Sequence, residues 1–158
     1  MKVAIGSDKS GFTLKEAIKA HLAENGIEYV EVGTLDLDHV KPFYVTAPEV
    51  AEKLLAKDAD FGILICGTGM GMSQVANKYK GIRAACVEST YAARMCRAIN
   101  DSNVLCLGGW EIAPELGLEL VDTFLKTSHT EGLEPWRQDF LKNALHEFQK
   151  LEDKIYQN

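Results

Sequence analysis

A cysteine followed by alternating glycines is the part of this sequence best suited to chemistry. The segment Phe61–Gly71 is an apolar run that ends in Cys66 and continues as Gly67-Thr-Gly69-Met-Gly71. Glycines allow a tight turn and a close approach of backbone N–H groups to a ligand, and such a loop, opening into a helix, binds negative charge. A cysteine at its rim would favour the thiolate form. The alternative is a buried, space-filling cysteine before an ordinary turn.

A second loop with reactive side chains, Gly6–Gly11, follows the first apolar run and contains Asp8 and Lys9. In open α/β sheets, ligands bind beyond the carboxyl ends of the strands, where the strand order reverses. For the order 2-1-3-4-5, this point lies between strands one and three. We therefore expect Asp8, Lys9 and Cys66 to share one cleft, next to helix N-termini that favour anions. Taken alone, an aspartate such as Asp8 is more often a helix cap than a catalyst.

A polar tetrad, Asn100–Asn103, precedes the last apolar run. It is either a plain turn or a source of amide donors for the same cleft.

The elements that position these residues alternate between strand and helix patterns. Apolar runs predict strands, and helical spacing of apolar residues predicts the helices between them. Thr46–Glu49 has the pattern of a capping box with a proline in the first helical turn. Five strands with four intervening helices predict a Rossmann-like, doubly wound α/β domain with a parallel sheet of order 2-1-3-4-5 and helices on both faces. The strands are expected at residues 2–5, 27–32, 61–65, 83–87 and 104–107.

Composition restricts the class of protein. With 158 residues, 46% of them apolar and 25% charged, residues 1–158 fit one globular domain. The net charge of −6 argues against nucleic acid as a partner, and no run approaches the roughly 20 apolar residues of a membrane span. The four cysteines form no C-x-x-C pair and have no zinc-type spacing. We expect free thiols, no metal and a reducing, cytoplasmic location.

A late segment, residues 136–156, has apolar residues at helical spacing although the helices of the sheet are already accounted for. This C-terminal helix either packs on its own domain or docks on a second subunit at a dimer interface, because an apolar stripe requires only some partner.

Several of these motifs together resemble the ribose-5-phosphate isomerase B family, which includes the galactose-6-phosphate isomerase subunits. The matching segments cover about residues 1 to 145, and the most specific of them is Ile65-Cys-Gly-Thr-Gly-Met-Gly71. The others are Gly6-Ser-Asp8, Asn77-Lys78, Gly81–Ala84 and Asn100–Val104. The resemblance implies an aldose–ketose isomerase that needs no cofactor and acts on a phosphorylated sugar. It also implies a homodimer or tetramer with each active site at a subunit interface.

The resemblance also implies roles for individual residues. Cys66 would be the base, Thr68 would polarise the substrate or shuttle a proton, and Asp8 would be an acid–base group near the sugar oxygens. The remaining members of the expected site bind substrate: Lys9, Gly67, Gly69, Met70, Gly71, Asn100 and Arg137. The chemistry suits these groups, because isomerisation needs a positioned base and donors for an enediolate.

This chain departs from the family pattern at three places. Lys9 replaces a histidine that helps to hold the phosphate, although a lysine can act there as a point charge. Ile99 replaces a histidine credited with opening the furanose ring, and His39 is a histidine whose loop could bring it to the cleft. The segment Gly132–Arg137 keeps one of two family arginines, and Lys41 stands where a tyrosine often lines the sugar site.

The proton-transfer half of the expected site is thus intact, whereas the ring-opening half is altered. We expect a sugar-phosphate isomerase with shifted specificity, for example toward a tetrose or tetrulose phosphate that is already open-chain. Three alternatives are a true ribose-5-phosphate or hexose-phosphate isomerase that opens rings by another group, a catalytically silent phospho-sugar-binding or regulatory module, and a thiol redox protein. The last is disfavoured because no resolving cysteine neighbours Cys66 in the sequence.

Overall fold

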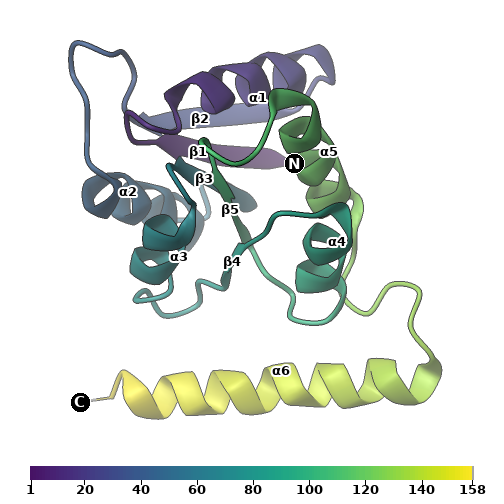
Figure 1. The fold of residues 1–158 in the computed structure, drawn as a ribbon. Coiled ribbons are helices and arrows are strands. Elements are labelled where there is room, and N and C mark those ends of the chain that lie inside the picture. The colour runs from purple at the N-terminus through teal and green to yellow at the C-terminus, as the bar shows by residue number, and fades with distance from the viewer. Residues whose placement is uncertain (158) are drawn as a thin grey trace.

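The alternating apolar runs form a five-stranded parallel sheet with helices on both faces (Figure 1). The computed structural model describes residues 1–157; Asn158, the last residue of the expected domain, lies outside them. The single α/β domain predicted from the sequence is confirmed. In chain order the elements are β1 (Lys2–Ser7), α1 (Phe12–Glu24), β2 (Glu28–Gly33), α2 (Phe43–Leu55), β3 (Phe61–Cys66), α3 (Met70–Ala76), β4 (Ala84–Cys86), α4 (Thr90–Ala98), β5 (Val104–Gly108), α5 (Pro114–Lys126) and α6 (Pro135–Ile155).

The strand side chains divide between two apolar clusters, because successive residues of a strand point to opposite faces. Ile63 and Ile65 of β3 belong to the cluster that contains buried residues of α1, α4 and α5. Leu64 and Cys66 belong to the cluster that contains buried residues of α2 and α3. The candidate base therefore lies on the α2–α3 face of the sheet.

The strand order is β2-β1-β3-β5-β4, so the last two strands are exchanged relative to the expected order 2-1-3-4-5. β5 pairs with β3 on one side and with the three-residue strand β4 on the other. The expected neighbours β1 and β3 do pair. The exchange brings the loop after β5 next to the loop after β3.

Helix α2 begins at Phe43, three residues before the expected capping box. Thr46 lies inside the helix and donates its hydroxyl to the carbonyl oxygen of Ser7, at 3.4 Å. Glu49 accepts the N–H of Gly33 at 2.8 Å. The predicted cap is wrong because both of its polar side chains bind the ends of β1 and β2 instead.

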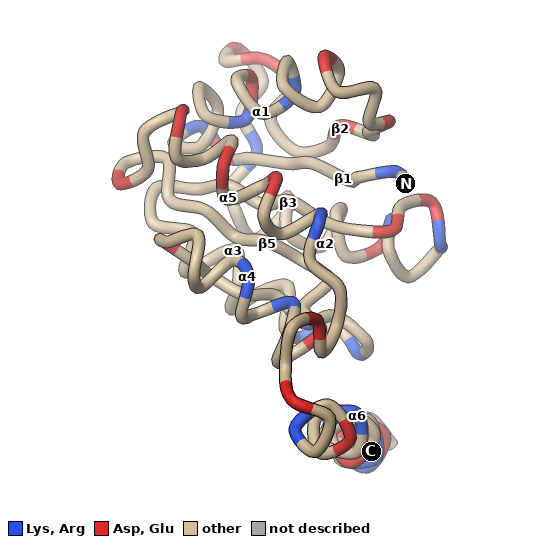
Figure 2. Tube along the Cα trace, turned by 90° about the vertical axis from the view of Figure 1, so that its right-hand side faces the viewer, with Lys and Arg blue, Asp and Glu red and all other residues tan. Residues whose placement is uncertain are grey.

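Helix α6 stands apart from the rest of the molecule, as two views at right angles show (Figures 1 and 2). Leu141 is its only buried residue among those described. Near its C-terminus, Glu152 accepts the N–H of Gly81 at 2.8 Å, and the Tyr156 hydroxyl donates to the carbonyl of Lys78 at 2.7 Å. Large apolar side chains on the helix stay exposed: Trp136, Phe140, Phe148, Leu151 and Ile155. Within residues 1–157, no helix is both long and apolar enough to cross a membrane.

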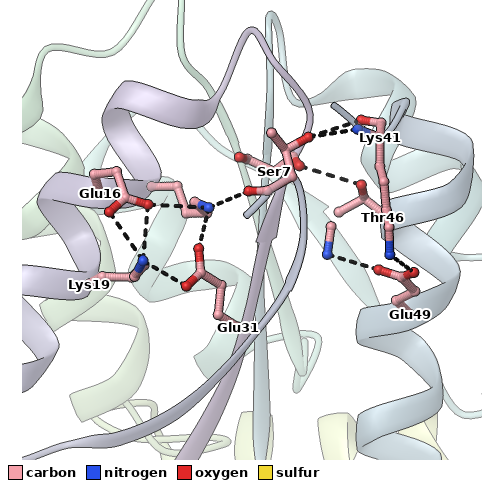
Figure 3. A network of polar contacts seen from close by, with 10 residues as sticks. Ser7, Glu16, Lys19, Glu31, Lys41, Thr46 and Glu49 are labelled. Atoms are coloured by element: carbon pink, nitrogen blue, oxygen red, sulfur yellow. Dashed lines mark hydrogen bonds and ion pairs between the residues drawn. The ribbon is translucent and has the colours of Figure 1, made fainter. Parts of the chain in front are cut away.

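A buried lysine connects α1 to the end of β2, within the polar network that includes Glu16, Lys19 and Glu31 (Figure 3). Lys15 is fully buried, and its Nζ bonds to the carboxylate of Glu31 and to the carbonyl of Thr34 at 2.5 Å. Lys19 also reaches Glu31, at 2.7 Å. Burial alone would raise the pKa of Glu31, but the hydrogen bonds from the two lysines outweigh it and leave that pKa lowered. The charge of Lys15 is thus compensated mainly by one carboxylate.

We predict that Glu31→Gln lowers the free energy of unfolding by about 3 kcal/mol, because it leaves the buried Lys15 ammonium without its main counter-charge. Urea unfolding at pH 7 measures this. Glu16→Gln is the matched control: Glu16 also contacts Lys15 but is 43% exposed, so the expected change is below about 1 kcal/mol. Equal effects of the two substitutions would contradict the assignment.

Candidate active site

Three loops meet where β1, β3 and β5 end, because these strands are neighbours and run in parallel. The N–H of Asp8 donates to the carbonyl of Ile65 at 3.2 Å, and the N–H of Gly109 donates to the carbonyl of Cys66 at 2.7 Å. A side chain at Gly11 would place its Cβ 2.4 Å from the carbonyl oxygen of Ile65. The loop after β1 must therefore have a glycine there to pass so close to β3.

The glycine loop curls back over the candidate base. The N–H of Gly69 donates to the sulfur of Cys66 at 3.1 Å, and Gly69 adopts the left-handed conformation, with φ of 74°, that this turn requires. Cys66 is 6% exposed. The N–H of Met70 faces the Thr68 hydroxyl at 3.4 Å. Helix α3 has only seven residues, and the hydrogen bond to the sulfur comes from the loop that precedes it.

Some backbone N–H groups of the glycine loop already donate hydrogen bonds within the protein. The N–H groups of Gly69 and Met70 bond within the loop. Those of Gly67, Thr68 and Gly71 donate to no protein acceptor within residues 1–157. These three amides are consequently the donors of the loop that remain available for a developing negative charge.

Asp8 forms a turn at the start of α1. Its Oδ1 accepts the N–H groups of Ser10 at 2.9 Å and Gly11 at 3.1 Å. Burial raises the pKa of the Asp8 carboxyl, and the two backbone hydrogen bonds oppose this without cancelling it. The structure thus brings the loops of Asp8 and Cys66 together as expected, and exposed Lys9 lies in the same loop.

Two aromatic residues at the glycine loop were not foreseen from the sequence. The N–H of Trp110, in the loop after β5, donates to the carbonyl of Gly67 at 3.0 Å. A side chain at Gly71 would place its Cβ 3.1 Å from the ring of Phe43, the first residue of α2. Gly108-Gly109 at the end of an apolar run was the available signal for Trp110, but the expected strand order placed that loop further away.

Asn100 lies near the amino ends of the strands, whereas Cys66 of the same chain lies at the carboxyl end of β3. Asn100 precedes β5, and in the pairing of β3 with β5 Gly62 is opposite Val104 and Cys66 is opposite Gly108. At about 3.3 Å per residue, the four steps along β3 alone span roughly 13 Å. Asn100 instead lines a cavity of about 430 Å³ together with Ile99 and residues of α6. One chain therefore does not place this amide in the cleft of the glycine loop.

Two arginines hold the turn that presents Asn100. Asp101, in the left-handed conformation with φ of 48°, accepts hydrogen bonds from Arg97 at 2.7 Å and Arg83 at 2.9 Å. The tetrad is thus a rigid turn with Asn100 exposed at its tip.

The other predicted residues also lie away from the glycine loop or are engaged elsewhere. Arg137 is in the first turn of α6 and half-buried. Lys41 pairs with Glu49 at 2.5 Å. His39 is 84% exposed and pairs with Asp36 in its own loop, so the structure does not bring it to the sulfur.

The three loops together thus present a thiol, a carboxyl group, a hydroxyl and three open amides. This set can move protons between adjacent carbons and oxygens and can stabilise an oxyanion. The described residues contain no group of three or more His, Cys, Asp or Glu side chains that could hold a metal ion.

The fold and this loop are those of a sugar-phosphate isomerase: the chain belongs to the ribose/galactose isomerase family, whose model matches residues 3–139. This confirms the family predicted from the motifs.

Three individual relatives show how similar this chain is to named isomerases. The chain is 57% identical, over 99% of its length and 98% of the relative's, to a 4-deoxy-4-sulfo-D-erythrose isomerase of Clostridium sp. (strain MSTE9). It is 42% identical to ribose-5-phosphate isomerase B of Escherichia coli, over 83% of this chain and 87% of that protein. A solved structure of the ribose-5-phosphate isomerase B of Clostridium thermocellum superimposes with a TM-score of 0.88 at 37% identity, covering 98% of this chain and 99% of the other.

We predict that Asp8→Asn raises the melting temperature at pH 7. The folded protein disfavours the charged carboxyl, since the pKa of Asp8 is raised, whereas an asparagine oxygen can still accept both backbone N–H groups. The gap between variant and wild type should close as the pH falls through the raised pKa toward 3.8, where wild-type Asp8 is also neutral.

Thermal unfolding between pH 7 and pH 4 measures the gap. Asp122→Asn is the control of opposite sign. Burial alone would raise the pKa of Asp122, but hydrogen bonds from Lys126 and His21 leave it lowered, so this variant should melt below wild type at pH 7. A lower melting temperature for Asp8→Asn at pH 7 would contradict the prediction.

Proposed function

We propose that this protein interconverts the aldose and ketose forms of a four-carbon sugar that carries a terminal sulfonate or phosphate, with Cys66 as the base. The observation that carries the choice of substrate is Ile99, at the position where ring-opening family members have a histidine, together with 57% identity to an isomerase of 4-deoxy-4-sulfo-D-erythrose.

The substrate chemistry agrees with the loss of that histidine. A furanose ring of an aldotetrose closes through the oxygen on its fourth carbon. In a 4-deoxy-4-sulfo sugar this oxygen is absent, and in a 4-phosphate it is esterified. Such a sugar is open-chain, so an enzyme for it needs no group that protonates a ring oxygen. An apolar side chain at position 99 therefore does not slow its reaction.

In the proposed reaction, the Cys66 thiolate removes the proton from the second carbon of the aldose. The electron pair forms the double bond of an enediolate, whose negative oxygen accepts the open N–H groups of Gly67 and Thr68. Asp8 and the Thr68 hydroxyl move a proton between the two neighbouring oxygens. Cys66 returns its proton to the first carbon, which gives the ketose with no net gain or loss of electrons.

The second half of the site comes, in this proposal, from another copy of the chain in a homodimer. Asn100 and Arg137 do not reach the glycine loop of their own chain, whereas α6 leaves large apolar side chains uncovered. Exposed apolar surface of this extent marks an interaction site. In a two-fold dimer each copy would give Asn100 and Arg137 to the other and receive the same residues.

We predict that Cys66→Ala lowers kcat about 10²- to 10⁴-fold, the usual contribution of a general base. Exchange of substrate hydrogen with D₂O, followed by NMR, measures proton removal directly on 4-deoxy-4-sulfo-D-erythrose, D-erythrose 4-phosphate and D-ribose 5-phosphate. The wild type should turn over a four-carbon substrate fastest.

Unchanged circular dichroism would show that the Cys66→Ala variant remains folded. A wild-type protein that binds these sugars without exchanging any hydrogen would be a binding module. Fastest turnover of D-ribose 5-phosphate would overturn the proposed substrate.

We predict that two inactive variants restore activity when they are mixed. In a mixed dimer of Cys66→Ala with Asn100→Ala, one site would receive wild-type Cys66 from one chain and wild-type Asn100 from the other. Random reassortment at equal amounts makes half of the dimers mixed, so about a quarter of the wild-type activity should return. No gain on mixing, with exchange of chains verified by mass spectrometry, would place both residues in the same subunit's site.

A further inference from the structure

Trp110 is the largest side chain at the glycine loop, and no step of the proposed reaction uses it. Its side chain is 75% exposed, although its main chain is hydrogen-bonded to Gly67, the residue that follows the candidate base. A large exposed aromatic side chain at the loop of the proposed base is a candidate for substrate contact.

The indole lies face-on over Gly67. A Cβ built on Gly67 would lie 2.7 Å from Cε3, 2.8 Å from Cδ2 and 2.8 Å from Cζ3 of Trp110. These three atoms are consecutive in the six-membered ring and almost equally distant, so Gly67 faces the plane of the ring rather than its rim. Because any side chain at position 67 would collide with the ring, the glycine makes room for the indole as well as for the turn.

The loop that carries Trp110 is fixed from both neighbouring strands. Besides its bond to Cys66, Gly109 approaches the first loop so closely that a Cβ would lie 2.7 Å from the carbonyl oxygen of Ser10. The carboxylate of Glu111 lies beside Gly108, 2.8 Å from where its Cβ would be. One face of the ring thus lies against Gly67, and a carboxylate lies beside Gly108 in the loop that carries the ring.

This surface suits a short carbon chain. An indole face packs against C–H groups, and its Nε1–H is a single neutral donor. Because the ring lies over Gly67, the residue after the proposed base, a substrate bound at the glycine loop would have less room for carbons beyond the reacting ones.

We propose that Trp110 is a specificity-determining residue that contacts the substrate carbon chain and restricts the site to four-carbon sugars. This inference rests on the proposed isomerase function and adds to it the residue that sets chain length. It assigns Trp110 to the same subunit's site as Cys66.

The first test compares kcat/KM of wild type, Trp110→Phe and Trp110→Ala on 4-deoxy-4-sulfo-D-erythrose, D-erythrose 4-phosphate and D-ribose 5-phosphate. Removal of the ring should lower kcat/KM for the four-carbon substrates at least 10-fold and leave that for D-ribose 5-phosphate unchanged or higher, with Trp110→Phe closer to wild type. Tyr91→Ala removes an aromatic side chain of equal exposure, 74%, from α4, and should leave the ratio between substrates unchanged. An equal loss on all three sugars, or a change of oligomeric state in gel filtration, would overturn the proposal.

The second test separates this inference from the proposed reaction. Trp110 and Trp136 are the two tryptophans, so Trp136→Phe in a Cys66→Ala background leaves Trp110 as the sole indole in a chain whose turnover is expected to be at least about 100-fold slower. Its emission should change saturably when 4-deoxy-4-sulfo-D-erythrose is added. A saturable change without turnover by the wild type would uphold the contact and reject the isomerase, whereas turnover without any change would reject the contact alone.

Discussion

The hydrogen bonds between the ends of β1, β3 and β5 are the constraint on which the site depends. Asp8 donates to Ile65 and Gly109 donates to Cys66, so the loops on both sides are joined to the strand that ends in the candidate base. These contacts require small residues, because a Cβ at Gly11 or Gly109 would collide with backbone oxygens. Asp8, Cys66 and Trp110 therefore lie close together as a consequence of backbone geometry, and their own side-chain contacts are secondary.

Much of this arrangement could be predicted from the sequence. The run Phe61–Cys66 and the glycines after it specify a buried strand and a turn, whatever the rest of the chain does. The parallel sheet follows from the alternation of strand and helix patterns, and the pairing of β1 with β3 follows from the usual arrangement of such sheets. The strand, the turn and the alternation were predictable because each depends on residues that are close in sequence, whereas the pairing of β1 with β3 was predictable from a general rule of sheet topology.

The parts that could not be predicted depend on contacts between distant segments. The runs that form β4 and β5 are both apolar and short, and no local signal says which of them pairs with β3. Because the predicted order of these two strands was wrong, the position of Trp110 beside the glycine loop was not predicted. Thr46 and Glu49 have the spacing of a helix cap, but the carbonyl of Ser7 and the N–H of Gly33 compete for them. The motif around Asn100 can be recognised from a few neighbouring residues, and this led to its expected place beside Cys66. The distance between the two residues depends instead on the length of the strands between them, which the motif does not reveal.

The turn that presents Asn100 has a consequence for mixed assemblies. Arg97 bonds to Asp101 and stacks on the interior ring of Phe61, 4.8 Å from its centroid, so the position of Asn100 depends on the packing inside its own subunit. If Asn100 serves a neighbour, then a chain with a damaged interior impairs the reaction centre of the healthy chain beside it as well as its own. Inactive alleles of that kind would act dominantly in a cell that also makes the intact protein.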